Sequence, residues 1–321
     1  LQIQIKIVGI SNSKKMIFNN AGININNWQI ELSSGEKTNE LEFFNRTKKL
    51  NLRNSIFIDN TASKIIASTY KYYLKNSINV ITCNKIACSD VFLNYRNLKE
   101  IALNNNSLFL YGTNVGAGLP IIETLNNLII SGDKIKSIQA VLSGSLNYIF
   151  NNFNKIDSFD KTVKDAISKG YTEPDPKVDL SGIDVARKIL ILARVCGKKT
   201  ELSDVEVESF LPKNCLNTKS NDELLKSLSI YSAHFNKILE NANNNNCKIK
   251  YVAEFNNQKI SVGLKLISKG HYFYNIEESD NIILFYTERY NAQPLIIKGA
   301  GAGSEVTASG IFRDIIRISG R

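Results

Sequence analysis

The residue types that could do chemistry gather in one acidic segment, residues 170–188 (GYTEPDPKVDLSGIDVARK). Its carboxylates are Glu173, Asp175, Asp179 and Asp184. Holding these like charges within about a dozen residues is electrostatically costly and favours a nearby cation. A substrate ammonium, Lys188 or a bound metal ion could each serve. The plainer interpretation of residues 173–179 is a solvated loop, in which acids and prolines are common.

Lys188 is the candidate acid or base of this segment. Ser181 is a candidate helix N-cap with Asp184 three residues later, and Asp184 and Lys188 have the spacing of a favourable i, i+4 ion pair. A cap and an ion pair on an exposed helix need no active site. Lys188, however, lies at the margin of an apolar stripe, where a partly desolvated ammonium beside carboxylates becomes a usable acid or base. The stripe consists of Val185, Ile189 and Leu192.

The rest of the composition argues against several other kinds of site. The 321 residues include two histidines, His234 and His271, too few for a multi-histidine metal site and a weak basis for a histidine triad. The cysteines are widely spaced and include no CxxC, which argues against a disulfide framework and a structural zinc site. They are Cys83, Cys88, Cys196, Cys215 and Cys247.

Charge and hydropathy restrict the partners. The formal net charge is +10, but the lysines are spread along the chain, so we expect no nucleic-acid partner, although the charge could help attract an anionic cofactor. No run of eighteen apolar residues and no secretory signal pattern occurs, so we expect no membrane span and place the protein in the cytoplasm. The chain begins at Leu1, directly in an expected strand, and we expect it to be a piece of a longer protein.

Residues 1–112 alternate short apolar runs with helical patterns, which is typical of parallel β-α-β units. Such doubly wound sheets place their ligand sites at the carboxyl ends of strands, where the stretches DNTAS and TCNK fall. The expected strands are 3–10, 55–59, 79–82 and 108–111, and the expected helices are 64–75 and 90–103. We therefore predict a Rossmann-type nucleotide-binding domain.

This predicted domain lacks the usual glycine loop. No strand, GxGxxG and helix unit stands at the start of the chain, and GAGLP (116–120) and GAGAG (299–303) do not substitute for it. The first strand lies in the middle of a doubly wound sheet, so its loss would leave unpaired edges. We expect an incomplete Rossmann-type domain, without its first strand, glycine loop and helix.

A second pattern follows from about residue 113. Helices at 120–131 and 160–168 flank a strand at 137–142, and a run of strands follows residue 247, which predicts an α+β domain with a largely antiparallel sheet. The expected late strands are 249–255, 259–267, 272–276, 282–286 and 295–297. We assign residues 113–298 to a substrate-binding and dimerisation domain. A last helix, 306–318, returns to the nucleotide-binding domain, which comprises 1–112 and 299–321.

A long ordered motif stands at 166–188 (AISKGYTEPDPKVDLSGIDVARK). Other distinctive stretches are YGTNVGAGLPIIETL (111–125), VLSGSLNYIF (141–150), GAGAGSEVTASGIFRDI (299–315), VGISNSKKM and GININNW. On these stretches the whole chain resembles homoserine dehydrogenase, and most of all the dehydrogenase half of the bifunctional aspartokinase/homoserine dehydrogenase enzymes. The family interconverts L-homoserine and L-aspartate 4-semialdehyde, a step towards threonine and methionine, with NAD or NADP.

The resemblance implies a role for each charged residue. Glu173 and Asp179 would hold the substrate ammonium, Asp184 would contact the hydroxyl end and steady the lysine, and Lys188 would give the aldehyde oxygen its proton. Lys85 matches the second lysine of the family beside the substrate. This agrees with the chemistry, because hydride delivery to a carbonyl carbon builds an alkoxide that an adjacent ammonium can stabilise and protonate.

The resemblance also implies cofactor and cation sites. The positions that match the cofactor lining are Thr61, Ser63, Lys85, Gly303 and Glu305. For Thr61 and Ser63 alone, a helix cap is the better interpretation. A monovalent cation, sodium or potassium, would bind the backbone carbonyls of Val115, Ala117 and Leu119. Gly112 stands where the family has an acidic cation ligand, which weakens this metal site.

Two functions of different class remain open. The first is the enzyme, active when it is joined to or complemented by its missing upstream part, and acting as a homodimer or larger homo-oligomer. An upstream aspartokinase segment is a further candidate partner. The alternative is a non-catalytic fragment or partner subunit that keeps the dimerisation domain and cannot bind cofactor unaided.

Overall fold

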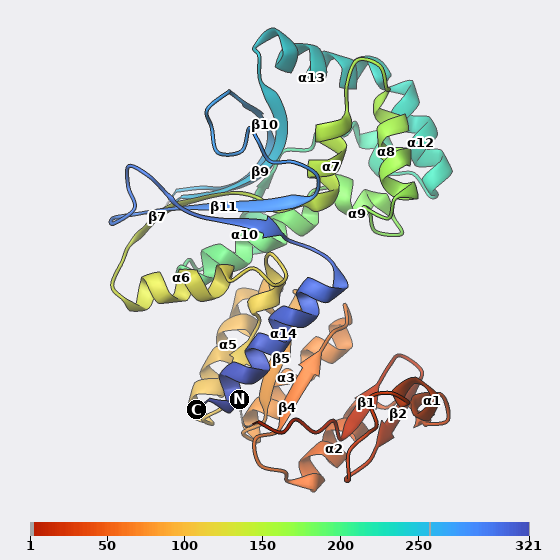
Figure 1. The fold of residues 1–321 in the computed structure, drawn as a ribbon, viewed down its shortest axis with the longest axis vertical. Coiled ribbons are helices and arrows are strands. Elements are labelled where there is room, and N and C mark those ends of the chain that lie inside the picture. Colours follow the sequence, from red (N-terminus) through yellow and green to blue (C-terminus); the bar gives the residue numbers. More distant parts are fainter. Residues whose placement is uncertain (1–2, 257, 321) are drawn as a thin grey trace. The chain divides into compact units, whose positions relative to one another are not determined.

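The computed structural model describes residues 3–256 and 258–320, and the chain forms two compact units (Figure 1). The first unit comprises residues 1–87, 93–111 and 312–321. The second comprises residues 88–92 and 112–311.

A three-stranded parallel sheet, in the order β4-β5-β6, lies in the first unit. The sheet is buried on both faces, because the successive β5 residues Val80 and Ile81 are both fully buried, and on the α3 side the ring of Phe57 stacks on that of Tyr73. The elements are β4 (Ile56–Asp59), α3 (Lys64–Lys75), β5 (Asn79–Thr82), α5 (Phe92–Asn104) and β6 (Phe109–Leu110). These parallel strands and their helices confirm the predicted parallel β-α-β pattern for residues 55–111.

The start of the chain differs from the prediction. The strand expected at 3–10 is reduced to β1 (Gly9–Ser11), which pairs antiparallel with β2 (Lys15–Phe18) in a separate sheet with β3 (Glu36–Lys37). The apolar residues of 3–8 look like a strand by composition, but residues 7 and 8 accept hydrogen bonds from Ile23 and Asn19, which fold the chain back locally. The helices of this region are α1 (Trp28–Ser33) and α2 (Glu40–Leu50).

A six-stranded mixed sheet, in the order β12-β11-β7-β9-β10-β8, organises the second unit. Only its last pair, β10 with β8, is parallel, which confirms the prediction of a largely antiparallel sheet. The strands are β7 (Ile135–Val141), β8 (Glu206–Val207), β9 (Lys248–Asn256), β10 (Ile260–Ile267), β11 (Asp280–Thr287) and β12 (Leu295–Ala300).

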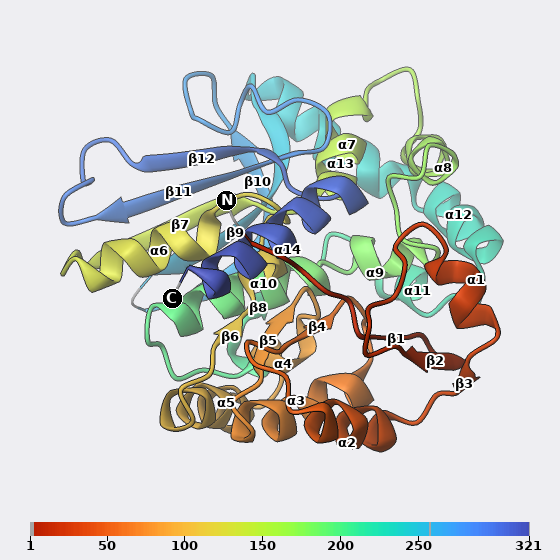
Figure 2. The same ribbon diagram turned by 60° about the horizontal axis from the view of Figure 1, so that its bottom comes forward.

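Helices cover one face of this sheet (Figures 1 and 2), where α6 (Ile121–Ile130) packs against α10 (Ile183–Val195) and α10 contacts β9 and β10. Alternate strand residues point to this face and are buried, including Ile138, Tyr251 and Phe285. The remaining helices are α7 (Gly144–Asn152), α8 (Phe159–Ser168), α9 (Pro176–Leu180), α11 (Lys213–Leu216), α12 (Asn221–Ile230), α13 (Ser232–Asn244) and α14 (Ser304–Ser319).

The opposite face holds a second core. The strand predicted at Tyr272–Ile276 is wrong: these residues form turns between β10 and β11, and Phe273 and Ile276 pack onto the sheet. The sheet residues beneath them are Val141, Val252, Ile267, Ile282 and Leu284. A short run of aromatic and apolar residues has the composition of a strand. Here Phe273 and Ile276, three residues apart, both point from the turns onto the same face of the sheet.

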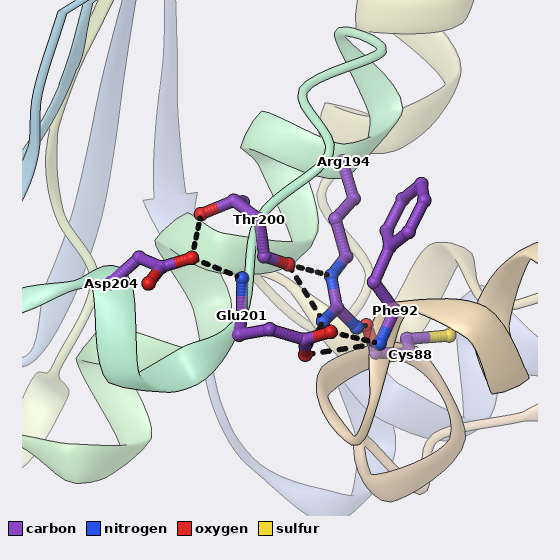
Figure 3. A network of polar contacts seen from close by, with 6 residues as sticks. All are labelled: Cys88, Phe92, Arg194, Thr200, Glu201 and Asp204. Atoms are coloured by element: carbon purple, nitrogen blue, oxygen red, sulfur yellow. Dashed lines mark hydrogen bonds and ion pairs between the residues drawn. The ribbon is translucent and has the colours of Figure 1, made fainter.

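A buried arginine ties residues 88–92 to the second unit (Figure 3). The side chain of Arg194 is 0% exposed and donates to the carbonyl of Cys88 at 2.8 Å, to the carbonyl of Thr200 and to Glu201 Oε2 at 3.1 Å. Both Glu201 carboxylate oxygens accept from the backbone N–H of Phe92 at 3.0 Å. A planar guanidinium can hold several acceptors at once, so this network fixes the segment that begins three residues after Lys85.

The compact units divide the chain differently from the domains assigned from the sequence in three places. Residues 88–92, Gly112 and residues 299–311 lie in the second unit, whereas the sequence places them with the nucleotide-binding domain. The last helix, predicted at 306–318, is confirmed as α14. The functional boundaries 1–112 with 299–321 and 113–298 stay a prediction.

Candidate active site

Lys188 is held by two acceptors at the margin of α10. Its Nζ lies 2.9 Å from Asp184 Oδ2 and donates to the carbonyl oxygen of Leu142 at 2.7 Å, and the lysine side chain is 12% exposed. An ammonium has three donors, and within the described part of the chain no third acceptor contacts this one. Two anchored donors orient the third, which has no acceptor among the described residues.

Asp179 lies in the same unit and is also held in place. Its Oδ1 accepts from Ser145 Oγ and its Oδ2 from the backbone N–H of Glu173, both at 2.8 Å. Burial raises the pKa of Asp179, and the carboxylates of Glu173 and Asp184 add to the rise, while the two hydrogen bonds oppose it. A cation bound here would favour the charged carboxylate. The side chain of Glu173 is exposed.

The acidic segment is not a simple solvated loop. Residues 176–180 form the short helix α9, whose N-cap Asp175 accepts from the backbone N–H of Lys177. The predicted N-cap role of Ser181 is wrong, because α10 begins after Gly182, which has φ +73°. A Cβ atom at Gly182 would lie 1.9 Å from the hydroxyl of Tyr251, so this close approach requires glycine.

Sequence reasoning assigned no role to the turn between β7 and α7. Ser143 caps α7 by accepting from Leu146 N–H, Ser145 contacts Asp179, and the carbonyl of Leu142 receives Lys188. The only signal was the SGS triplet after a strand, which is typical of a helix N-cap. A backbone carbonyl acceptor leaves no mark in a sequence.

In the first unit, a buried polar cluster organises the two strand ends. The carboxylate of Asp59 accepts from the hydroxyl of Tyr70, from Asn84 Nδ2 at 3.0 Å and from the backbone N–H of Thr61 at 2.7 Å. Thr82 Oγ1 lies 2.8 Å from the hydroxyl of Tyr70. This cluster joins the turn that follows β4 to the turn that follows β5, where parallel sheets bind ligands.

The predicted cofactor residues of the first unit lie on these two turns. Thr61 Oγ1 accepts from the backbone N–H of Ser63, and Ser63 caps α3 by accepting from Ile66 N–H at 3.3 Å. The helix-cap interpretation is therefore confirmed for Ser63. Lys85 is partly buried between β5 and α4 (Ile86–Ser89).

Gly303 and Glu305, in the second unit, stand at the start of α14. Gly303 has φ +114°, its carbonyl accepts from Thr307, and Glu305 is exposed in the first helical turn. A carboxylate at a helix N-terminus is favourable without any ligand, so their position alone assigns no cofactor role.

The predicted cation turn is tightly wound. Gly116 and Ala117 have φ +74° and +51°, and the carbonyl of Leu119 accepts from Ile121 N–H at 2.8 Å. One of the three proposed carbonyls, those of Val115, Ala117 and Leu119, thus already has a protein partner. Among residues 3–256 and 258–320, no group of three or more His, Cys, Asp or Glu side chains could hold a metal ion.

No helix within residues 3–256 and 258–320 is long and apolar enough to cross a membrane.

Comparison with protein families gives two adjacent matches. The family model for homoserine dehydrogenase matches residues 120–316, and the model for the homoserine dehydrogenase NAD binding domain matches residues 1–111. Together these two matches cover nearly the whole chain, from residue 1 to residue 316, except for residues 112–119.

Curated relatives agree with these matches. A chloroplastic bifunctional aspartokinase/homoserine dehydrogenase of Arabidopsis thaliana is 40% identical over 321 residues, which cover 99% of this chain and 35% of that protein. The homoserine dehydrogenase of Schizosaccharomyces pombe is 40% identical over 272 residues, which cover 82% of this chain and 72% of that protein. The chain thus spans about a third of the length of the bifunctional relatives.

Solved structures share the fold. A Candida auris protein described as of unknown function superposes with a TM-score of 0.92 and 33% identity, covering 100% of this chain and 92% of that one. A hyperthermophilic archaeal homoserine dehydrogenase in complex with NADPH gives 0.73 and 24% identity, covering 97% and 87%. The second likeness bears on the fold alone.

Proposed function

Because the chain belongs to the homoserine dehydrogenase family, we propose that it interconverts L-homoserine and L-aspartate 4-semialdehyde with NAD or NADP. The observation that carries the proposal is the arrangement of Lys188, which is held by Asp184 and the Leu142 carbonyl with one donor left for a substrate oxygen. The bound nicotinamide would supply or accept the hydride.

In the reductive direction, a hydride forms the new C–H bond at the aldehyde carbon while the C=O π electrons move to oxygen. The Nζ of Lys188 gives a proton to that oxygen, so the products are an alcohol and a neutral lysine amine. In the oxidative direction, the neutral amine takes the hydroxyl proton as the hydride leaves carbon. Asp184 would keep the ammonium aligned in both directions.

The substrate ammonium would bind beside Asp179 and Glu173. The support is the burial of Asp179, which disfavours its charge until a cation arrives, and the two hydrogen bonds that already orient its oxygens. Lys85 is the candidate for the second lysine near the substrate. Thr61, Ser63, Gly303 and Glu305 are the candidates for the cofactor lining.

Further properties are part of the same proposal. The family model for the NAD binding domain matches residues 1–111, so the comparison does not confirm that this domain is incomplete. Its incompleteness stays a prediction. A sodium or potassium ion at the carbonyls of Val115, Ala117 and Leu119, a homodimer or larger oligomer, an upstream aspartokinase and a cytoplasmic location also stay predictions. The comparisons favour the enzyme over a non-catalytic subunit.

Steady-state oxidation of homoserine by Lys188→Ala tests the proposal. We expect turnover to fall by about 10²- to 10⁴-fold, the usual contribution of a general acid or base, with unchanged binding of cofactor. Glu173→Gln should instead raise the KM for homoserine, and Lys164→Ala, at an exposed lysine of α8, serves as the matched control. Normal turnover of Lys188→Ala would exclude the acid role.

A further inference from the structure

The carbonyl of Leu142 has a second donor besides Lys188. Asn281 Nδ2 donates to the same oxygen at 3.3 Å, while Lys188 Nζ donates at 2.7 Å. Leu142 is fully buried between β7 and α7. Two donors on one carbonyl use both of its lone pairs, which restrains the direction in which the carbonyl points.

Asn281 is itself rigidly placed. It is 0% exposed and pairs with Gly299 on β12, and its neighbour Ile282 pairs with Val141, the residue before Leu142. Its Oδ1 has no hydrogen-bond partner in the part of the chain that the structure describes. A buried asparagine with one unpaired oxygen is an expensive residue, so its amide is expected to have a use that an apolar side chain could not supply.

Gly301 lies directly against this amide. A Cβ atom at Gly301 would lie 2.0 Å from Asn281 Nδ2 and 2.1 Å from its Cγ, so no larger residue fits without displacing the amide. The backbone φ of Gly301 is not in the left-handed region, so close contact rather than strain requires glycine there. Contacts therefore run without interruption from the GAGAG segment through Asn281 and Leu142 to Lys188.

We propose that Asn281 is a positioning residue that fixes the Leu142 carbonyl and, through it, the direction in which Lys188 presents its free N–H. This rests on the proposed function of Lys188. Without the amide donor, the carbonyl still accepts from the lysine but is free to tilt, and a small misplacement of a proton donor slows turnover more than it weakens binding. Gly301 preserves the arrangement by leaving room for the amide.

Kinetics of Asn281→Ala and Gly301→Ala test this role, with Thr287→Val as the control. Thr287 is buried at the far end of the same strand, where it bonds Asp133 and Tyr290. We expect Asn281→Ala to lower kcat by about 10- to 100-fold per folded site, with both KM values within about threefold. The solvent deuterium isotope effect on kcat should rise, because proton transfer becomes more rate-limiting. Gly301→Ala should show the same changes to a smaller extent.

If Asn281 served only the stability of the fold, its replacement would change the melting temperature and leave kcat and the isotope effect unchanged. Thr287→Val is expected to lower the melting temperature but to keep kcat and the isotope effect. The proposal is overturned if Asn281→Ala keeps wild-type kcat, or if it loses activity with no change in the isotope effect. If Asn281→Ala does not fold, wild-type kinetics of Gly301→Ala overturn it. Wild-type kinetics of Asn281→Ala beside an inactive Lys188→Ala would refute only this inference and leave the proposed function standing.

Discussion

Two lysines of the second unit, Lys188 and Lys250, have opposite surroundings. Lys188 is slightly exposed and bonds one carboxylate and one carbonyl. Lys250 is 0% exposed, and its Nζ donates to three neutral oxygens, Asn147 Oδ1 at 2.8 Å, Asn151 Oδ1 at 2.6 Å and the carbonyl of Ile276 at 2.8 Å. Among the described residues, the Lys188 ammonium has acceptors for two of its three donors, and the Lys250 ammonium has acceptors for all three.

The difference shows that burial and a lowered pKa do not by themselves identify a catalytic lysine. Burial lowers the pKa of Lys250 to about 8, and the charge of Lys248 adds to the effect. A pKa this close to neutral would make Lys250 the more obvious acid or base. Its complete set of acceptors instead indicates a structural role, joining β9 to α7 and to the turn before β11. Lys188 is the better candidate for an acid or base, because one of its three N–H donors has no acceptor among the described residues.

The largest effect expected from this comparison is on folding. Lys250→Met should lower the free energy of unfolding by about 2 to 4 kcal/mol, because the three buried oxygens lose their donor. Turnover per folded molecule should stay within about twofold, since Lys250 takes no part in the proposed chemistry. Urea unfolding and steady-state assays measure both, with Lys164→Met, at an exposed lysine of α8, as the control. A stable but inactive Lys250→Met would reverse the roles of the two lysines.

A smaller effect should appear in the pH dependence of stability. The pKa of Lys250 is about 8 in the folded chain against an ordinary 10.5, so between these values the unfolded state binds more protons and folding stability rises with pH. Relative to Lys250→Met, the wild type should gain at most about 1.4 kcal/mol per pH unit above pH 8 and nothing below it. Urea unfolding of both proteins at pH 7, 8, 9 and 10 measures this. A constant difference would show that the ammonium stays charged.

The smallest effect concerns Tyr251, which is next to Lys250 on β9 and faces α10 instead. Its hydroxyl contacts Gly182 but has no hydrogen-bond partner among the described residues. Tyr251→Phe should therefore be neutral or stabilising by up to about 1 kcal/mol, because it removes an unpaired buried hydroxyl. Thermal unfolding should show the opposite sign for Tyr148→Phe, whose hydroxyl bonds both Asp165 and Lys169. A clear loss of stability in Tyr251→Phe would mean that the hydroxyl has a partner.

Elements with a strong apolar period were predictable from the sequence. The stripe of Val185, Ile189 and Leu192 is fully buried in α10, as its three- and four-residue spacing indicates. The start of that helix was not predictable, because Ser181 and Asp184 carry a capping signature while the close approach of Tyr251 to Gly182 sets the actual start. Tertiary contacts of this kind override local signals.

The candidate site divides in the same way. Asp184 and Lys188 could be paired from their spacing on a helix. The Leu142 carbonyl and Asn281 could not, because a backbone acceptor has no residue type, and the two are 139 residues apart. The burial of Lys250 was not predictable either, because its acceptors come from two asparagines and a backbone carbonyl that are distant in the sequence.

The anchoring of residues 88–92 by Arg194 has a consequence for protein engineering. The chain passes between the units at 87/88, 92/93, 111/112 and 311/312, so no single cut separates them. A chimera that exchanges residues 1–112 as one block would take the 88–92 turn from the other parent, so the backbone carbonyl that accepts from Arg194 and the backbone N–H that donates to Glu201 would then lie on a foreign turn. Modular exchange between relatives should therefore succeed only when Arg194 and Glu201 travel with the 88–92 turn.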